Sequence, residues 1–189
     1  MGPLSEEEKE GLKLDFIIDR KTVYQLEQTN IEDALQWLRT SKLKVEQVLS
    51  VSLLQRLPQK MFGQVWKWAG RYRRTEKNIG ILPHLIAIET QKLVDDAHYW
   101  YEQDTYAPIE LAIRFKHRLV SIHCFPNGNG RHSRLMADLI VEKLYGMPYF
   151  SWGSSTLVAD DLIRKTYISA LKKADKGELG DLIDFANKP

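Results

Sequence analysis

The chain contains a single cysteine, Cys124, among its 189 residues. One cysteine excludes an internal disulfide framework and a cysteine-rich zinc site, and it is typical of a reducing compartment. No apolar run reaches the roughly 18 residues of a membrane span, and the acidic N-terminus is unlike a secretory signal peptide. We therefore expect a cytoplasmic protein without a membrane partner.

The chain also has little net charge. Its 27 lysines and arginines face 25 aspartates and glutamates, so the formal charge is +2. This balance is unlike that of nucleic-acid-binding domains, and we expect no nucleic acid as a partner. The composition, 43% hydrophobic and 28% charged, is that of a globular protein. The length suits one domain of roughly 100–200 residues.

Helical periodicity extends through most of the chain, for example in the apolar stripe of Leu111, Phe115, Leu119 and Ile122. Helices are predicted over residues 22–39, 45–57, 87–103, 108–123, 131–145, 159–174 and 178–186. We expect Pro58 to end or restart the second helix, and the first ten residues to be loose. Residues 71–82 lose the periodicity and predict a short hairpin or an extended loop. The predicted fold class is all-α with one short β-hairpin.

The segment from His123 to Arg134 carries the clearest chemical signal. It reads His-Cys-Phe-Pro-Asn-Gly-Asn-Gly-Arg-His-Ser-Arg and joins two predicted helices. Its glycines allow a close backbone approach to a ligand, and the outgoing helix offers free N–H donors to an anion. Arg131 lies on the same helix face as Arg134, and two cations near a helix N-terminus favour a bound anion. These features predict a polyphosphate site with His123 as a general base; a Gly/Asn turn beside surface arginines is the alternative.

This segment resembles the signature of the Fic (filamentation induced by cyclic AMP) family, His-x-Phe-x-Asp/Glu-Gly-Asn-Gly-Arg-x-x-Arg. Seven of the eight specified positions match. The stretch Phe62–Gly70 and the arginines after it resemble a second element of the family, and residues 75–82 stand where the family has its β-hairpin flap. The resemblance implies a Fic domain over 45–187, preceded by an N-terminal helical extension over 1–44.

Two short elements in the extension narrow the resemblance further. Glu10–Leu12 and Glu27–Ile31 resemble the subgroup called mobile mystery protein B. Inhibited members of the family carry a helix with the pattern Ser/Thr-x-x-x-Glu-Gly/Asn, whose glutamate pairs with the second signature arginine. Glu32 and Glu10 are the nearest matches, although each lacks part of the pattern. A solvated glutamate on an amphipathic helix is the alternative for both.

The family resemblance implies AMP transfer from ATP to a Ser, Thr or Tyr hydroxyl of a protein, with loss of pyrophosphate. His123 would take the hydroxyl proton. The residues implied to bind the phosphates are Gly128, Asn129, Gly130, Arg131 and Arg134. ATP and Mg²⁺ are the implied cofactors. The implied partners are a nucleotide and an unidentified target protein, with the chain itself as one candidate.

One position departs from the signature, and it leaves other functions open. Asn127 stands where the family has an Asp or Glu metal ligand. An amide oxygen coordinates Mg²⁺ without charge attraction, so we expect weakened metal binding. One alternative is transfer of UMP, phosphocholine or phosphate through the same loop. The other is a weakly active, nucleotide-binding regulatory or toxin–antitoxin module.

Overall fold

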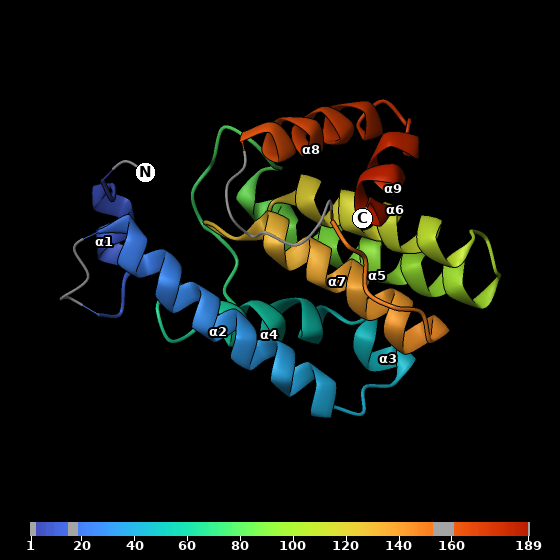
Figure 1. The fold of residues 1–189 in the computed structure, drawn as a ribbon, viewed down its shortest axis with the longest axis horizontal. Coiled ribbons are helices and arrows are strands. Elements are labelled where there is room, and N and C mark those ends of the chain that lie inside the picture. The colour runs from blue at the N-terminus through green and yellow to red at the C-terminus, as the bar shows by residue number, and fades with distance from the viewer. Residues whose placement is uncertain (1–2, 15–18, 153–160, 189) are drawn as a thin grey trace.

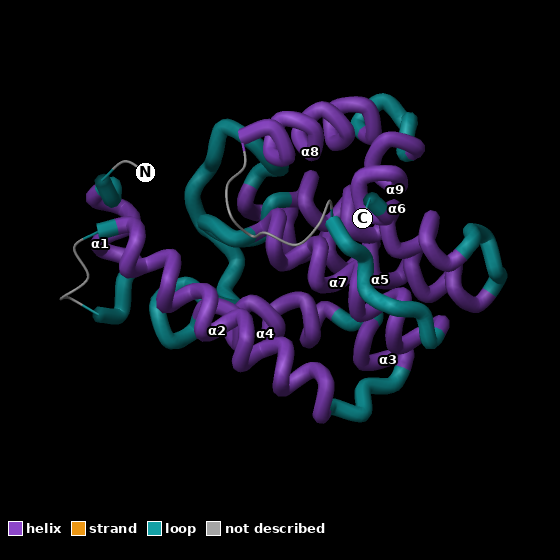
Figure 2. The backbone as a smooth tube through the Cα atoms, in the orientation of Figure 1, coloured by secondary structure: helices purple, strands orange, loops and turns teal. Residues whose placement is uncertain are grey.

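The computed structural model describes residues 3–14, 19–152 and 161–188. Its helices, in chain order, are α1 (Glu6–Gly11), α2 (Arg20–Thr40), α3 (Val45–Val48), α4 (Val51–Phe62), the 3-10 turn η1 (Pro83–Leu85), α5 (Ile86–Glu102), α6 (Pro108–Ile122), α7 (Asn129–Tyr145), α8 (Asp161–Ala174) and α9 (Gly180–Asn187). Among the described residues there is no β-strand, as Figure 2 shows. The predicted all-α class is confirmed.

The helices are arranged around α6 and α7, which are joined by residues 123–128 and pack against each other (Figure 1). α5 lies against α6, α2 lies along α4, and α9 holds α8 against the other end of α6. The apolar stripe predicted for α6 is buried, with Leu111 and Phe115 wholly inaccessible. None of the described helices is both long and apolar enough to cross a membrane.

Two sequence predictions about the N-terminal half are corrected. The opening residues were expected to be loose, but residues 6–10 form helix α1, which starts with a capping box between Ser5 and Glu8. The predicted helix 45–57 is divided at Ser50, whose hydroxyl accepts the Leu53 N–H at 3.1 Å and starts α4. Pro58 does not end α4, which continues to Phe62. The buried face of α4 offsets the hydrogen bond that proline removes.

Candidate active site

His123 is the residue at which α6 ends. Its backbone is left-handed, with φ 56°, a conformation that is uncommon outside glycine. The two residues that follow, Cys124 and Phe125, are each 1% exposed, so the chain enters the core directly after the helix. The His123 side chain is only partly buried. The left-handed turn thus leaves the imidazole accessible between two buried segments.

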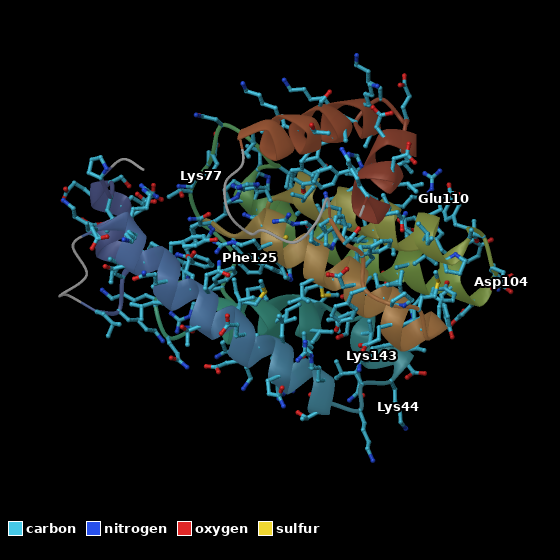
Figure 3. The ribbon with its side chains drawn as sticks, viewed as in Figure 1. Lys44, Lys77, Asp104, Glu110, Phe125 and Lys143 are labelled. Carbon is cyan, nitrogen blue, oxygen red and sulfur yellow. The ribbon has the colours of Figure 1, made fainter. Side chains whose placement is uncertain are left out.

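The side chain of Asn129 holds the following loop closed. Its amide oxygen accepts the Phe125 N–H at 3.0 Å, and its amide nitrogen donates to the Phe125 carbonyl at 2.7 Å. The Phe125 ring packs against those of Trp68, Tyr72 and His132, and Figure 3 labels it near the start of α7. Both polar atoms of the Asn129 side chain are therefore engaged within the loop. The donor that Asn129 can offer a ligand is its backbone N–H.

Helix α7 begins without a side-chain cap. Its N-cap residue, Gly128, has φ 77°, and a Cβ there would lie 2.7 Å from the Phe62 ring, so glycine is required. At Gly130, the nearest described atom outside the backbone of α7 to a Cβ position is the Tyr167 hydroxyl, at 4.0 Å. An uncapped helix start presents N–H donors and a positive dipole end. This is the geometry that the predicted phosphate site requires.

The two signature arginines lie in different surroundings on α7. Arg131 pairs with Glu27 through Nη1 and Oε2 at 2.6 Å. Arg134 stands over the Tyr167 ring at 5.6 Å and has no described carboxylate within ion-pair distance. Burial is the largest cause that lowers the pKa of Arg134. A half-buried guanidinium without a carboxylate partner is partly desolvated, and a bound anion would offset the cost of that desolvation.

Glu27 reaches the site from α2, one of the two helices that the structure describes in residues 1–44, the predicted N-terminal extension. It is 4% exposed, and its second oxygen accepts the Trp66 indole N–H at 2.6 Å. Glu32 and Glu10, the nearest matches to the inhibitory pattern, are both exposed. The structure therefore brings Glu27 to a signature arginine instead, and that arginine is Arg131 rather than Arg134. The element Glu27–Ile31 was the sequence signal that pointed to this region.

The flap, defined here as residues 71–82, is an extended loop and not the predicted hairpin (Figure 1). Buried Arg73 takes the place of a strand ladder. Its guanidinium donates to the carbonyls of His123 at 2.6 Å, Thr75 at 2.9 Å and Ile81. The backbone N–H of Arg73 donates to the Cys124 carbonyl at 2.9 Å. One side chain therefore fixes both ends of the flap to the end of α6.

The flap also sets the electrostatic surroundings of His123. Burial, followed by the positive charges of Arg73 and Lys77, lowers the pKa of the imidazole. Lys77 itself extends from the flap and pairs with Glu7 of α1 at 2.6 Å (Figure 3). A lowered pKa leaves His123 unprotonated at neutral pH. The imidazole is then in the form that can accept a proton from a hydroxyl.

The residues around the loop offer little to a metal ion. Asn127 is exposed, and its side-chain oxygen accepts the N–H of Gly128 at 2.7 Å. The described residues form no cluster of three or more histidines, cysteines, aspartates or glutamates that could hold a metal. Magnesium is usually held by carboxylates together with substrate phosphates. The site thus supplies one neutral oxygen and does not fit a resident Mg²⁺.

The structure adds a buried polar pair behind the loop that sequence reasoning missed. Lys116 of α6 is fully buried and donates to the Tyr167 hydroxyl of α8 at 2.6 Å. Burial, followed by the charge of Arg134, lowers the pKa of Lys116 well below its ordinary value of 10.5. Tyr167 is also a hydrogen-bond partner of Ser133, and burial raises its pKa to about 12. The only sequence signal was a lysine adjacent to the apolar stripe of α6.

Comparison with known proteins gives consistent results. The model of the Fic/DOC family matches residues 48–141. A Fido domain-containing protein of Dictyostelium discoideum is 30% identical over 111 residues, which are 57% of this chain and 72% of that protein. Protein adenylyltransferase fic-1 of Caenorhabditis elegans is 28% identical over 127 residues, which are 64% of this chain. The match covers only 23% of the fic-1 protein.

The fold of this chain is similar to the folds of solved structures. A fragment of C. elegans Fic-1 superposes with a TM-score of 0.67 at 26% identity, covering 84% of this chain and 46% of that chain. The BepC protein of Bartonella tribocorum, solved with bound AMPPNP, gives a TM-score of 0.70 at 16% identity and covers 93% of this chain and 89% of its own. The matched residues 48–141 include the whole signature segment. The chain belongs to the Fic/DOC family.

Proposed function

We propose that the protein transfers AMP from ATP to a Ser, Thr or Tyr hydroxyl of a protein. The observation that carries the proposal is the position of His123, left-handed at the end of α6, one short loop before the uncapped start of α7. A neutral base, a set of N–H donors and two arginines thus lie on one short segment of the chain, residues 123–134. Adenylyltransferases among the relatives support the same reaction.

The proposed chemistry assigns a separate task to each part of the site. The imidazole of His123 removes the hydroxyl proton as the acceptor oxygen attacks the α-phosphorus. The bond between that phosphorus and the oxygen bridging to the β-phosphate breaks, and pyrophosphate leaves. Donors at the start of α7, with Gly130 at their centre, bind the charge that develops on the phosphate oxygens. Arg131 and Arg134 bind the outer phosphates.

We infer in addition that Glu27 competes with the nucleotide for Arg131. Both oxygens of Glu27 are hydrogen-bonded, one of them to Nη1 of Arg131, so the carboxylate occupies one donor of Arg131 and places a negative charge beside any phosphate that binds there. This observation favours the second candidate function, a nucleotide-binding regulatory module of low basal activity. Glu27→Gln keeps an acceptor for Trp66 and removes the charge. We expect the variant to bind ATP more tightly than wild type while its affinity for adenosine is unchanged.

A double-label experiment tests the reaction. Protein is incubated with ATP labelled at the α-phosphate or at the γ-phosphate, and incorporation into protein is compared for wild type and His123→Ala. AMP transfer predicts α-label only. We expect His123→Ala to lose about 10²–10⁴-fold of that incorporation while ATP binding persists. Incorporation of γ-label would indicate phosphate transfer, and undiminished α-label in the variant would remove His123 from the mechanism.

A further inference from the structure

A hollow of about 820 Å³ lies on the face formed by the end of α4 and the turn before the flap. Its charged lining residues are Lys13, Arg56, Lys60, Lys67 and Arg71. A second hollow of about 610 Å³ shares Arg56 and Arg71 with it, so the two form one groove, called the basic groove below. Among the residues that the structure describes, no carboxylate lines either hollow.

This concentration of charge does not follow from composition, because the whole chain has a formal charge of only +2. All five cations are exposed. Within the described part of the chain, none of them forms an ion pair. Five like charges around one depression repel one another and attract polyanions. The groove therefore favours a ligand that carries several negative charges.

Four of the five cations are held in place by uncharged groups. The ammonium of Lys13 donates to the Gly63 carbonyl at 2.5 Å, and that of Lys67 donates to the Glu10 carbonyl at 3.0 Å. Arg56 and Lys60, one helical turn apart on α4, lie over the Trp37 ring at 4.9 and 5.5 Å. These contacts orient the side chains without neutralising them. The groove is thus positioned to bind an anion with limited loss of side-chain entropy.

The groove lies close along the chain to the candidate active site. Arg71 is two residues before Arg73, which bonds to the backbones of His123 and Cys124. A segment of protein that presents a hydroxyl to His123 needs only a few extended residues, at about 3.3 Å each, to pass the flap and reach Arg71. Trp66, which holds Glu27, also lies in the groove wall. The groove and the base are therefore within reach of one bound peptide.

We propose that the basic groove binds an acidic segment of the protein that receives AMP, which places glutamates or aspartates near the modified hydroxyl. The inference rests on the proposed function. A peptide fits the lining better than a nucleic acid does. Binding of single strands relies on exposed aromatic rings on which bases stack. Here Trp66 is 2% exposed, and Arg56 and Lys60 cover the Trp37 ring.

The test uses the full chain and measures binding without ATP. The probe is a fluorescein-labelled peptide of six glutamates followed by a threonine-containing hexapeptide, and its partner has glutamines in place of the glutamates. The groove variant is Arg56→Glu/Lys60→Glu, accompanied by the milder Arg56→Gln/Lys60→Gln. Lys172→Glu/Lys176→Glu, with two exposed lysines near the end of α8, is the control for charge alone. Circular dichroism checks that each variant is folded.

We expect wild type and control to bind the acidic peptide and not its glutamine partner, with affinity that falls as salt rises. Charge reversal in the groove should weaken binding at least about tenfold, equivalent to about 1.4 kcal/mol. Equal binding of the two peptides, equal loss in the control, or tighter binding of a twelve-nucleotide oligothymidylate would overturn the proposal. So would self-association through the groove in place of peptide binding.

A second readout separates the groove from the proposed function. In the α-label assay, the groove variant should show a raised KM for the acidic peptide and an unchanged affinity for ATP. If no peptide accepts α-label while charge-dependent binding persists, then the proposed reaction fails and the groove remains a binding surface for acidic protein. If label is transferred equally to acidic and glutamine peptides, then the groove proposal fails and the reaction stands.

Discussion

At the scale of single residues, Asn127 is the position where this chain departs from the signature of its family. Its side-chain oxygen already accepts a backbone N–H from Gly128, and it carries no charge to attract a cation. Asn127→Asp restores the charge at unchanged side-chain length. We expect the variant to need less Mg²⁺ for half-maximal AMP transfer, because magnesium prefers anionic oxygen ligands. The α-label assay, repeated over a range of Mg²⁺ concentrations, measures this. An unchanged midpoint would show that residue 127 does not coordinate the metal.

His123 provides a second prediction at this scale, in the pH profile. Burial, then Arg73 and Lys77, lower the pKa of the imidazole from its ordinary value of 6.5. The base is active only when unprotonated, so activity should fall with decreasing pH below 6.5 and be level near neutrality. Lys77→Met removes one of the three causes and should move the acidic limb to higher pH. The nucleotide affinity of the variant serves as the control, and a limb that does not move would mean that Lys77 does not act on His123.

At the scale of elements, the flap depends on one glycine. Gly80 has φ 92°, and a Cβ there would lie 2.5 Å from the Cβ of His123. Gly80→Ala therefore combines backbone strain with a clash that moves the flap or the base. Gly177→Ala is a matched control, since Gly177 has φ 90° with nothing within 4 Å of its Cβ position. We expect both variants to lose stability through backbone strain, Gly80→Ala more because of the clash, and a loss of AMP transfer of about 10- to 100-fold only in Gly80→Ala. Equal transfer rates would contradict a close flap.

Elements were predictable from sequence wherever local pattern and burial agree. The stripe from Leu111 to Ile122 gave α6 because its period matches one buried face. The prediction that α4 ends or restarts at Pro58 was wrong. The hydrogen bond that proline removes is offset by the packing of the buried face of α4 against distant parts of the chain, which no local pattern contains. Of the two alternatives predicted for residues 71–82, the extended loop is present and the hairpin is absent, for a similar reason. Its conformation is set by Arg73 bonding to the end of α6, a contact between residues 50 apart.

The candidate site likewise has a part that could be predicted from local sequence and a part that depends on contacts between distant residues. The phosphate-binding loop could be predicted from the sequence, because one short segment, His123 to Arg134, contains the proposed base, the glycines and both arginines. Glu27 was noticed only as part of the element Glu27–Ile31, and its pairing was not predicted, because its partner Arg131 is 104 residues away. The pairing of Lys116 with Tyr167 spans 51 residues. Contacts at such separations depend on tertiary packing, which a single sequence does not reveal.

At the scale of the whole molecule, Lys116 makes the free energy of unfolding depend on pH. Burial lowers its pKa in the folded state, whereas the unfolded chain keeps the ordinary value of 10.5. Between the lowered pKa and 10.5 the unfolded state therefore binds more protons, so the contribution of Lys116 to stability rises with pH, by up to about 1.4 kcal/mol per unit. Lys116→Met removes this contribution and leaves Ser133 as a partner for the Tyr167 hydroxyl.

The measurement is the free energy of unfolding by urea at several pH values between 7.5 and 9, for wild type and Lys116→Met. Other buried groups, such as Asp138 with its pKa raised to about 7, titrate alike in both proteins and cancel in the difference. We expect the variant to be the more stable protein at pH 7.5, because methionine fills the site without the cost of removing a proton from a buried lysine. Its advantage should shrink as pH rises, because removing the proton from the lysine costs less free energy as the pH approaches the unfolded-state value of 10.5. A difference that stays constant across the range would show that Lys116 keeps its proton in the folded protein, and that the Tyr167 hydroxyl and its surroundings stabilise a buried ammonium.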